Sequence, residues 1–230
     1  MTLAAFAVNF FVALFALIDP IGCAPLFAAA TAGAPSAGRR LTAAYIALFS
    51  FVFMAVFFVT GLALLRFFGI SLAAFRLAGG VLLFLLGLDM ARGNLASSLA
   101  DATGEAAGGL SARDYALARF ERLVVPFAMP LLIGPGAIST VVIYAGEAGK
   151  LGFAGEAAGV GVTFAIGVSI LASFWFAGLI TRLLGRIGMI IVIRVLGLIL
   201  CALAVQFMII GVSEATVGLL LPSAAAPYAK

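Results

Sequence analysis

The chain alternates long apolar runs with shorter polar segments. Four of the runs contain no proline, and they extend over Leu41–Leu65, Ser71–Met90, Phe153–Ile180 and Gly188–Val212. An α-helix needs about 20 predominantly apolar residues to cross the hydrocarbon core of a bilayer, and each of these runs reaches that length. The pattern therefore predicts four uninterrupted transmembrane helices.

Two further apolar runs are interrupted by proline and glycine. The first extends over Leu3–Ala30 and contains Ile18-Asp19-Pro20-Ile21-Gly22; the second extends over Leu123–Gly146 and carries three prolines and two glycines between Pro126 and Gly136. Proline removes a backbone donor and clashes with the preceding turn, so the helical hydrogen-bond ladder should break at these points. Backbone groups freed at membrane depth are costly unless protein, water or a ligand satisfies them. Each break is therefore a candidate binding site.

The breaks occur at corresponding places in two halves of the chain. Ile18-Asp19-Pro20 aligns with Ile133-Gly134-Pro135 at an offset of 115 residues, and the segment that begins at Arg76 resembles the one that begins at Arg194, at an offset of 118. Interrupted hydrophobic segments at matching positions of two halves are typical of secondary transporters. Because three spans is an odd number, the second half enters the membrane from the opposite side. We predict an all-α integral membrane protein with six transmembrane helices in two inverted three-helix repeats, with helices 1 and 4 broken.

This interpretation divides the chain into four parts. Residues 1–90 form the first repeat, 91–122 a polar cytoplasmic linker, 123–213 the second repeat and 214–230 a short extracytoplasmic tail. Within the linker, Ser111-Ala112-Arg113-Asp114 has the pattern of an N-cap that opens a short amphipathic helix leading into the fourth span.

Basic residues predict how the chain is oriented. With the N-terminus outside, most arginines fall in inside loops, namely Arg39, Arg40, Arg92, Arg113, Arg119, Arg122, Arg182 and Arg186. The outside loops then hold chiefly Arg66, Lys150 and Lys230. Since cytoplasmic loops carry an excess of Lys and Arg, we expect both termini to be extracytoplasmic, in a multi-pass protein of the cytoplasmic (inner) membrane.

Composition excludes several classes of protein. The chain is 65% hydrophobic and 10% charged, with a mean hydropathy of +1.30, which is too apolar for a soluble domain. Histidine is absent and the two cysteines lie in separate spans, so we expect no metal and no cofactor. The basic residues lie in short loops, which argues against nucleic-acid binding. No nucleotide-binding motif and no nucleophile–base arrangement is visible, and we expect no enzymatic activity.

A broken helix presents two opposite dipole ends inside the membrane. The N-terminus of the following half offers N–H groups to a carboxylate, and the C-terminus of the preceding half offers carbonyls to a cation or an ammonium group. A zwitterionic amino acid matches both ends. The residues expected to line the site are Ile18, Asp19, Pro20, Gly22, Cys23 and Ala24 in the first break, and Ile133, Gly134, Pro135, Gly136, Ala137, Ile138, Ser139 and Thr140 in the second.

Two carboxylates are candidates for ion coupling. Asp19 lies beside the first break, where it is either a cation partner or protonatable group, or simply the N-cap of the helix that begins at Pro20. Asp89 lies at the end of the third span, where a solvated interfacial carboxylate is the simpler reading. For the breaks themselves the alternative is a pair of kinked helices that bind no ligand.

At these residues the sequence resembles the MarC family, also called the neutral amino acid transporter (NAAT or SnatA-like) family, within the LysE-type exporters. The resemblance covers about Leu14 to Gly211, and it rests on Asp19-Pro20-Ile21-Gly22 with Pro25, Phe75-Arg76-Leu77-Ala78-Gly79-Gly80 through Leu88-Asp89-Met90, Pro126-Phe127-Ala128-Met129-Pro130 with Gly134-Pro135-Gly136-Ala137-Ile138, and Arg194-Val195-Leu196-Gly197 with Gln206. It implies six helices in inverted repeats and small neutral amino acids bound at the breaks. The family often has asparagine directly after the first glycine, whereas this chain has Cys23.

These observations predict a secondary transporter that moves small neutral amino acids, such as glycine and alanine, by alternating access. The expected partners are these amino acids and the lipid bilayer, with coupling to H⁺ or Na⁺ and a homo-oligomeric assembly both left open. The alternatives are an exporter of another small metabolite and a membrane scaffold that transports nothing.

Overall fold

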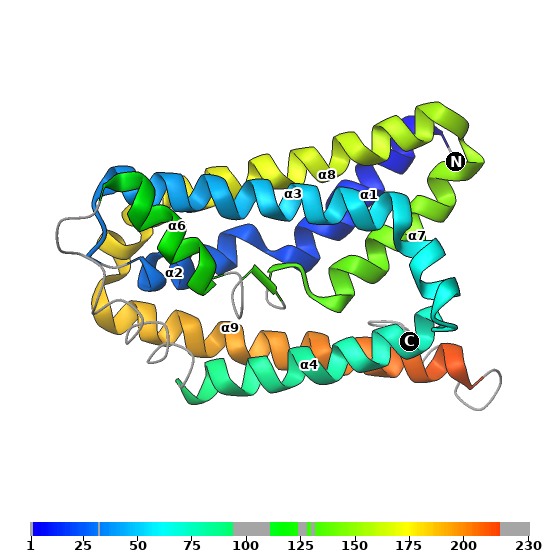
Figure 1. Cartoon of the computed structure of the whole chain (residues 1–230). Helices are drawn as coiled ribbons and strands as arrows, with labels where there is room; N and C mark the ends of the chain where they lie inside the picture. The colour runs from blue at the N-terminus through cyan, green and yellow to red at the C-terminus, as the bar shows by residue number, and fades with distance from the viewer. Residues whose placement is uncertain (1, 32, 94–110, 124–127, 130–131, 217–230) are drawn as a thin grey trace.

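The computed structural model describes residues 2–31, 33–93, 111–123, 128–129 and 132–216. Its described part is helical and contains no strand. The helices are α1 (Leu3–Ile18), α2 (Pro20–Ala30), α3 (Ser36–Phe67), α4 (Leu72–Arg92), α6 (Ala112–Leu123), α7 (Pro135–Lys150), α8 (Gly152–Trp175) and α9 (Ala177–Ala215). Figure 1 shows that α3, α4, α8 and α9 extend between the same two ends of the molecule, and that the other helices are shorter. The chain is thus an all-α membrane protein, as predicted.

Five stretches of the described residues are long and apolar enough to span a membrane. They are Leu3–Ala30, Ser36–Phe67, Leu72–Arg92, Gly152–Leu179 and Ile187–Ala215. These five correspond to five of the six predicted spans. Of the predicted fourth span, the structure describes Leu123 at the end of α6, residues 128–129 and 132–134, and then α7, whose 16 residues are too few for a complete span. The predicted linker and tail lie largely outside the described residues.

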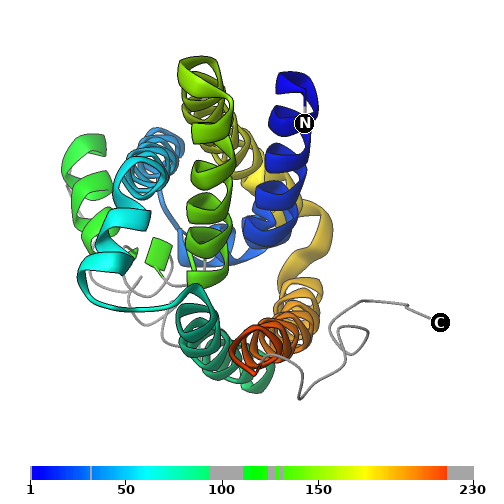
Figure 2. The same cartoon turned by 90° about the vertical axis from the view of Figure 1, so that its right-hand side faces the viewer.

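The helices form two bodies. In the end-on view of Figure 2, α4 and α9 lie side by side on one side of the molecule, and the other helices are grouped opposite them. The pair is joined to the rest mainly through contacts of α9 with α2 and of α4 with α7. The helix breaks at Asp19 and Gly134 therefore lie on the elements that meet this pair.

Small residues at seven-residue spacing hold α4 and α9 together. They are Ala73, Gly80 and Gly87 on α4, and Gly197, Ala204 and Gly211 on α9. A Cβ atom on Gly87 would lie 2.9 Å from the carbonyl oxygen of Gly197, and one on Gly80 would lie 2.8 Å from that of Ala204. Backbones approach this closely in membranes because lipid offers no hydrophobic gain, so that helix association depends on close packing. The thiol of Cys201 adds a contact with the carbonyl of Phe84, at 3.7 Å.

An ion pair fixes one end of this helix pair. Arg76, in the second turn of α4, donates to the carboxylate of Glu214 in the last turn of α9. Arg76 thus joins the two helices through an ion pair.

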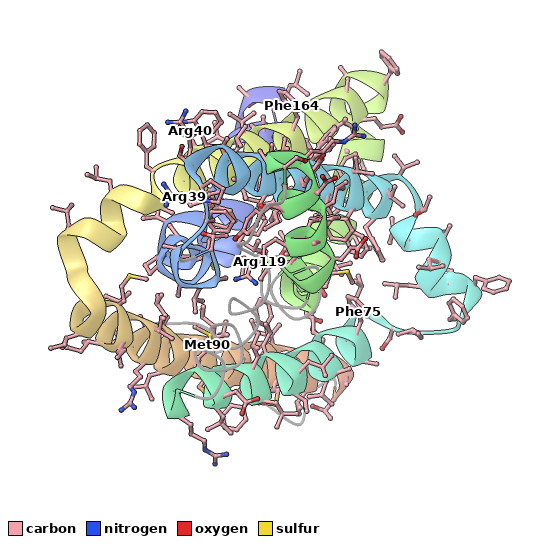
Figure 3. All side chains as sticks on the ribbon, turned by 60° about the vertical axis from the view of Figure 1, so that its left-hand side comes forward. Arg39, Arg40, Phe75, Met90, Arg119 and Phe164 are labelled. Carbon is pink, nitrogen blue, oxygen red and sulfur yellow. The ribbon has the colours of Figure 1, made fainter. Side chains whose placement is uncertain are left out.

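The amphipathic helix α6 is anchored at the end of the molecule where α2 finishes. Its first turn is capped as predicted: the hydroxyl of Ser111 accepts a hydrogen bond from the N–H of Asp114 at 3.2 Å. Arg119 is only 2% exposed and donates to the carbonyl of Ala30, and Figure 3 shows its side chain directed from α6 into the molecule. Burial raises the pKa of the neighbouring Tyr115 phenol, although Arg119 and Arg39 act in the opposite direction. The phenol is therefore neutral near pH 7.

Basic residues collect at that same end. In Figure 1 the beginning of α3 and the end of α4 lie toward this same end of the molecule; α3 carries Arg39 and Arg40 there, and α4 carries Arg92. The opposite end carries Arg66 and Lys150, and there Lys150 is paired with Glu147 at 2.6 Å. The predicted separation of charge between the two ends of the bundle is therefore present.

We expect Gly87→Val to separate α4 from α9. The added side chain meets backbone atoms of α9, which cannot rotate away, so overpacking should cost about 2 kcal/mol or more. For a chain of this size the midpoint of thermal unfolding in detergent should fall by roughly 4 °C or more. Gly161→Val on α8 is the control, since a Cβ atom there meets nothing within 4 Å. Equal midpoints for the two variants would contradict the close packing of the pair.

Candidate functional site at the two helix breaks

The first break is centred on a single residue, Asp19. Its backbone has φ 41° and ψ 65°, which is the left-handed region, and no other residue except glycine has a positive φ in the described part. Aspartate tolerates this conformation better than most residues do. Ile18 ends α1 and Pro20 starts α2, so the helix is interrupted where the sequence predicts.

The break is largely satisfied by groups of its own chain. The carboxylate of Asp19 accepts a hydrogen bond from the N–H of Gly22 at 3.0 Å, and its carbonyl accepts one from the N–H of Cys23 at 3.0 Å. A side chain on Gly22 would collide with this carboxylate. The thiol of Cys23, at the position where the family often has asparagine, lies 3.6 Å from the carbonyl of Ile18.

Internal capping changes what the first break can do. We expected the backbone of Gly22 to Ala24 to receive a substrate carboxylate, but the N–H groups of Gly22 and Cys23 are already bonded within the chain. The feature left available is the carboxylate of Asp19, which is exposed. This break therefore offers negative charge.

The second break has the opposite character. Helix α7 begins at Pro135 after Gly134, which is extended (φ −73°, ψ 169°) and provides no side-chain cap. The carbonyl of Gly134 accepts the usual helical hydrogen bond, from the N–H of Ile138 at 3.0 Å. The first N–H groups of an uncapped helix point outward and carry partial positive charge. This break thus offers donors to an anion.

Two buried serine hydroxyls have no hydrogen-bond partner, and one of them, that of Ser139, lies at the second break. Ser139 is 1% exposed and Ser50 is fully buried, and neither hydroxyl has a hydrogen-bond partner. Other buried hydroxyls in the described part, on Thr31, Thr42 and Thr163, donate to a carbonyl of their own helix. Ser139 is in the second turn of α7, while Ser50 follows Phe49, whose ring contacts Phe120 of α6. Unsatisfied buried hydroxyls are costly, and in native proteins they often mark sites completed by water or ligand.

One face of α9 forms a wall that both breaks share. At the first break, a pocket of about 40 Å³ is lined by Leu17, Ile18, Asp19, Gly22, Cys23 and Leu26 from α1 and α2, by Met90 from α4, and by Leu196, Ile199, Leu200 and Leu203 from α9. At the second break, a Cβ atom on Gly136 would lie 2.5 Å from the ring of Phe207. Leu203 and Phe207 are one helical turn apart, about 6 Å along the axis. The two breaks therefore meet α9 on adjacent turns.

The remaining predicted residues lie around these two points. Pro20 and Ala24 are buried on α2; Ile133, Ala137 and Ile138 are buried around the start of α7; Thr140 is half-buried. Asp89 is exposed near the end of α4 and does not line the pocket, although its neighbour Met90 does. The geometry thus separates Asp89 from Asp19.

Sequence reasoning did not single out the residues of α4 and α9 that line the pocket and face the two breaks. Leu203, Phe207 and Met90 belong to helices that are apolar on all sides, so no periodic pattern shows which face packs against the breaks. A usable signal was the seven-residue spacing of small residues on α4 and α9, because it marks the faces that these helices turn to each other. No group of three or more His, Cys, Asp or Glu side chains suited to a metal ion occurs among the described residues.

Taken together, the fold and the site define a multi-pass helical membrane protein with two intramembrane helix breaks on one apolar wall. The model of the MarC family integral membrane protein matches residues 4–216, so the chain belongs to the MarC family. It is 30% identical to the UPF0056 membrane protein YhcE of Escherichia coli, over 92% of this chain and 94% of the relative. It is 32% identical to YvbG of Bacillus subtilis, over 87% and 90% respectively. No solved structure shows significant similarity.

Substitutions of Asp19 should separate its capping role from its charge. Asp19→Asn keeps both the side-chain acceptor and the tolerance of left-handed backbone, so stability should stay within about 0.5 kcal/mol of wild type. Asp19→Ala loses both, and the free energy of unfolding should fall by roughly 2 kcal/mol. Thermal unfolding in detergent measures the difference. If the alanine variant were as stable as the asparagine variant, the carboxylate would not be stabilising the break.

Proposed function

We propose that this protein is a secondary transporter of small neutral amino acids, which bind between the two helix breaks. The observation that carries the proposal is the complementary character of the breaks. Asp19 offers an exposed carboxylate at the first, and the uncapped N-terminus of α7 offers N–H donors at the second. The ammonium group of an amino acid is a partner for the former, and its carboxylate is a partner for the latter.

The hydroxyl of Ser139 supports a polar ligand at the second break. A carboxylate at the start of α7 has two oxygens with several acceptor positions, more than the first N–H groups of one helix fill. The unpartnered hydroxyl of Ser139 supplies a further donor on the same helix. A ligand that accepts this bond removes the cost of burying the hydroxyl, which is a reason for the site to favour an anionic group over lipid.

The size of the pocket supports a small side chain. Its volume is about 40 Å³, and the α9 residues that face it are leucine and isoleucine. Phe207 closes the second break from the same helix, directly over Gly136. This space suits the side chains of glycine and alanine, whereas a large substrate would require α9 to move away.

The contacts between α4 and α9 support the inverted-repeat interpretation. Gly80 faces Ala204 and Gly87 faces Gly197. An offset of 117 residues, one less than the 118 of the sequence match between Arg76 and Arg194, relates Gly80 to Gly197 and Gly87 to Ala204. In that register, exchanging the two helices reproduces the same contacts. That is the relation expected of equivalent antiparallel helices from repeats 1–90 and 123–213. In transporters built this way, one repeat rocks against the other around a central site.

The charge distribution supports the predicted orientation in the cytoplasmic membrane. We place the end with Arg39, Arg40 and Arg92 inside and both termini outside. An exporter of another small metabolite would use the same site with different ligand contacts. A scaffold would leave both breaks without a ligand, and the unpartnered hydroxyls without a role.

Ser139→Ala tests the site directly. Removing a hydroxyl that has no protein partner should leave thermal stability unchanged or slightly raised. Loss of a hydrogen bond to a carboxylate should weaken binding of glycine and L-alanine about tenfold, since such bonds contribute roughly 1.5 kcal/mol or more. Isothermal calorimetry on detergent-purified protein measures both affinities.

The matched control is Ser169→Ala on α8, whose hydroxyl donates to the carbonyl of Ala165 at 2.9 Å. Its affinity for glycine should equal that of wild type. Wild-type protein that is folded but binds neither glycine, L-alanine nor L-serine would overturn the proposed substrate class. Equal weakening by both serine variants would place the effect outside the second break.

Ion coupling is tested in proteoliposomes. If Asp19 carries the coupling proton, Asp19→Asn should abolish uptake of glycine driven by a pH gradient, because the amide keeps the cap but does not titrate. Glycine exchange should persist at a higher half-saturating concentration, since the amide lacks the charge that pairs with the ammonium group. Asp89→Asn should leave gradient-driven uptake unchanged, since Asp89 lies away from the pocket. Gradient-driven uptake that survives in Asp19→Asn would exclude Asp19 as the coupling group.

A further inference from the structure

A second pocket lies at the basic end of the molecule, away from the helix breaks. Its volume is about 270 Å³, and it is lined by Arg39, Arg40, Trp175, Phe176, Gly178 and Leu179. Figure 3 shows Arg39 and Arg40 at the start of α3, beside the turn that connects α8 to α9. The pocket therefore lies where the helices leave the apolar part of the molecule.

The charges around this pocket favour an anion. Arg39 and Arg40 follow directly on the first residues of α3, whose N-cap, Pro35, makes no side-chain hydrogen bond and whose first turn contains no acidic residue. Cations at a helix N-terminus add to the partial positive charge of the dipole instead of compensating it. Within the described residues, neither arginine has a carboxylate within ion-pair distance. Positive charge is thus concentrated here without a protein counter-ion.

The two guanidinium groups are held in place by their neighbours. The guanidinium of Arg40 lies over the ring of Trp175, 4.8 Å from its centre. Arg39 reaches across to Gly178, where a Cβ atom would lie 2.6 Å from one guanidinium nitrogen. A cation over an indole face is attracted to it, and tryptophan is enriched at membrane–water interfaces. The arginines therefore present fixed donors at the level of lipid headgroups.

A neighbouring apolar pocket shares a wall with the basic one. It also measures about 270 Å³ and is lined by Ile21, Ala24, Ala172, Ser173 and Phe176. Phe176 borders both pockets, and Ile21 is 60% exposed. A free phosphate ion would make no contact with the apolar pocket. A molecule with a phosphate group and a hydrocarbon chain could occupy both pockets.

We propose that these two pockets together bind one anionic phospholipid, with its phosphate on Arg39 and Arg40 and an acyl chain along Phe176 toward Ile21. Basic pockets between transmembrane helices at the cytoplasmic side are suited to such headgroups. The acyl chain would contact α2 within the first turns after the Asp19 break. This assignment does not depend on which substrate the protein transports.

Native mass spectrometry of the full-length protein in detergent tests the proposal, with phosphatidylglycerol and phosphatidylcholine as the two lipids. Wild type should retain phosphatidylglycerol in preference, and the double variant Arg39→Gln/Arg40→Gln should bind it at least tenfold more weakly. Arg66→Gln is the matched control, because Arg66 is an exposed arginine on the same helix at the opposite end. It should bind phosphatidylglycerol as wild type does.

Two further measurements distinguish a phospholipid site from a general anion site. Trp175→Leu leaves the charges in place but removes the ring beneath Arg40, and it should weaken binding of phosphatidylglycerol less than the double variant does. Inorganic phosphate at millimolar concentration should not displace the lipid. Equal binding of the two lipids, unchanged binding in the double variant, or displacement by phosphate would each overturn the assignment of a phospholipid site.

Discussion

The structure depends on how backbone polar groups are satisfied where two helices break inside an apolar bundle. In the first break the chain does this itself, through the carboxylate of Asp19 on the N–H of Gly22. In the second, the start of α7 has no side-chain cap and the hydroxyl of Ser139 has no partner. Because unsatisfied groups are expensive in a low-dielectric interior, this difference gives the two breaks different chemistry.

Close packing of α4 against α9 provides the frame for the breaks. Where glycine faces a backbone carbonyl, as at Gly87 and Gly197, neither helix can shift without losing contact along the seam. That seam fixes the rotation of α9 and therefore the direction in which Leu203 and Phe207 point. A pocket at a broken helix needs such a fixed opposite wall, since the broken segment has fewer hydrogen bonds of its own to resist movement.

At the basic end of the bundle, the effect of each arginine depends on which end of a helix dipole lies beside it. Arg119 is buried and donates to the last carbonyl of α2, where the negative end of the helix dipole favours a cation. Arg39 and Arg40 lie at the positive end of α3, where the dipole opposes them. The first arrangement stabilises the fold by itself, whereas the second leaves charge available for a ligand. Arginines at the same end of the molecule thus either stabilise the fold or remain available to a ligand, because they lie at opposite ends of helix dipoles.

The sequence by itself determined the membrane class, most of the spans and the positions of both breaks, because length, apolarity and proline act locally. It offered the N-cap of the helix starting at Pro20 as one of two roles for Asp19, and the structure shows that hydrogen bond. Only the tertiary structure decided which break is capped and which is open, and that Leu203 and Phe207 face them. Helices that are apolar all round carry little information about which face packs inward, so those contacts depend on the detailed fit of one backbone against another.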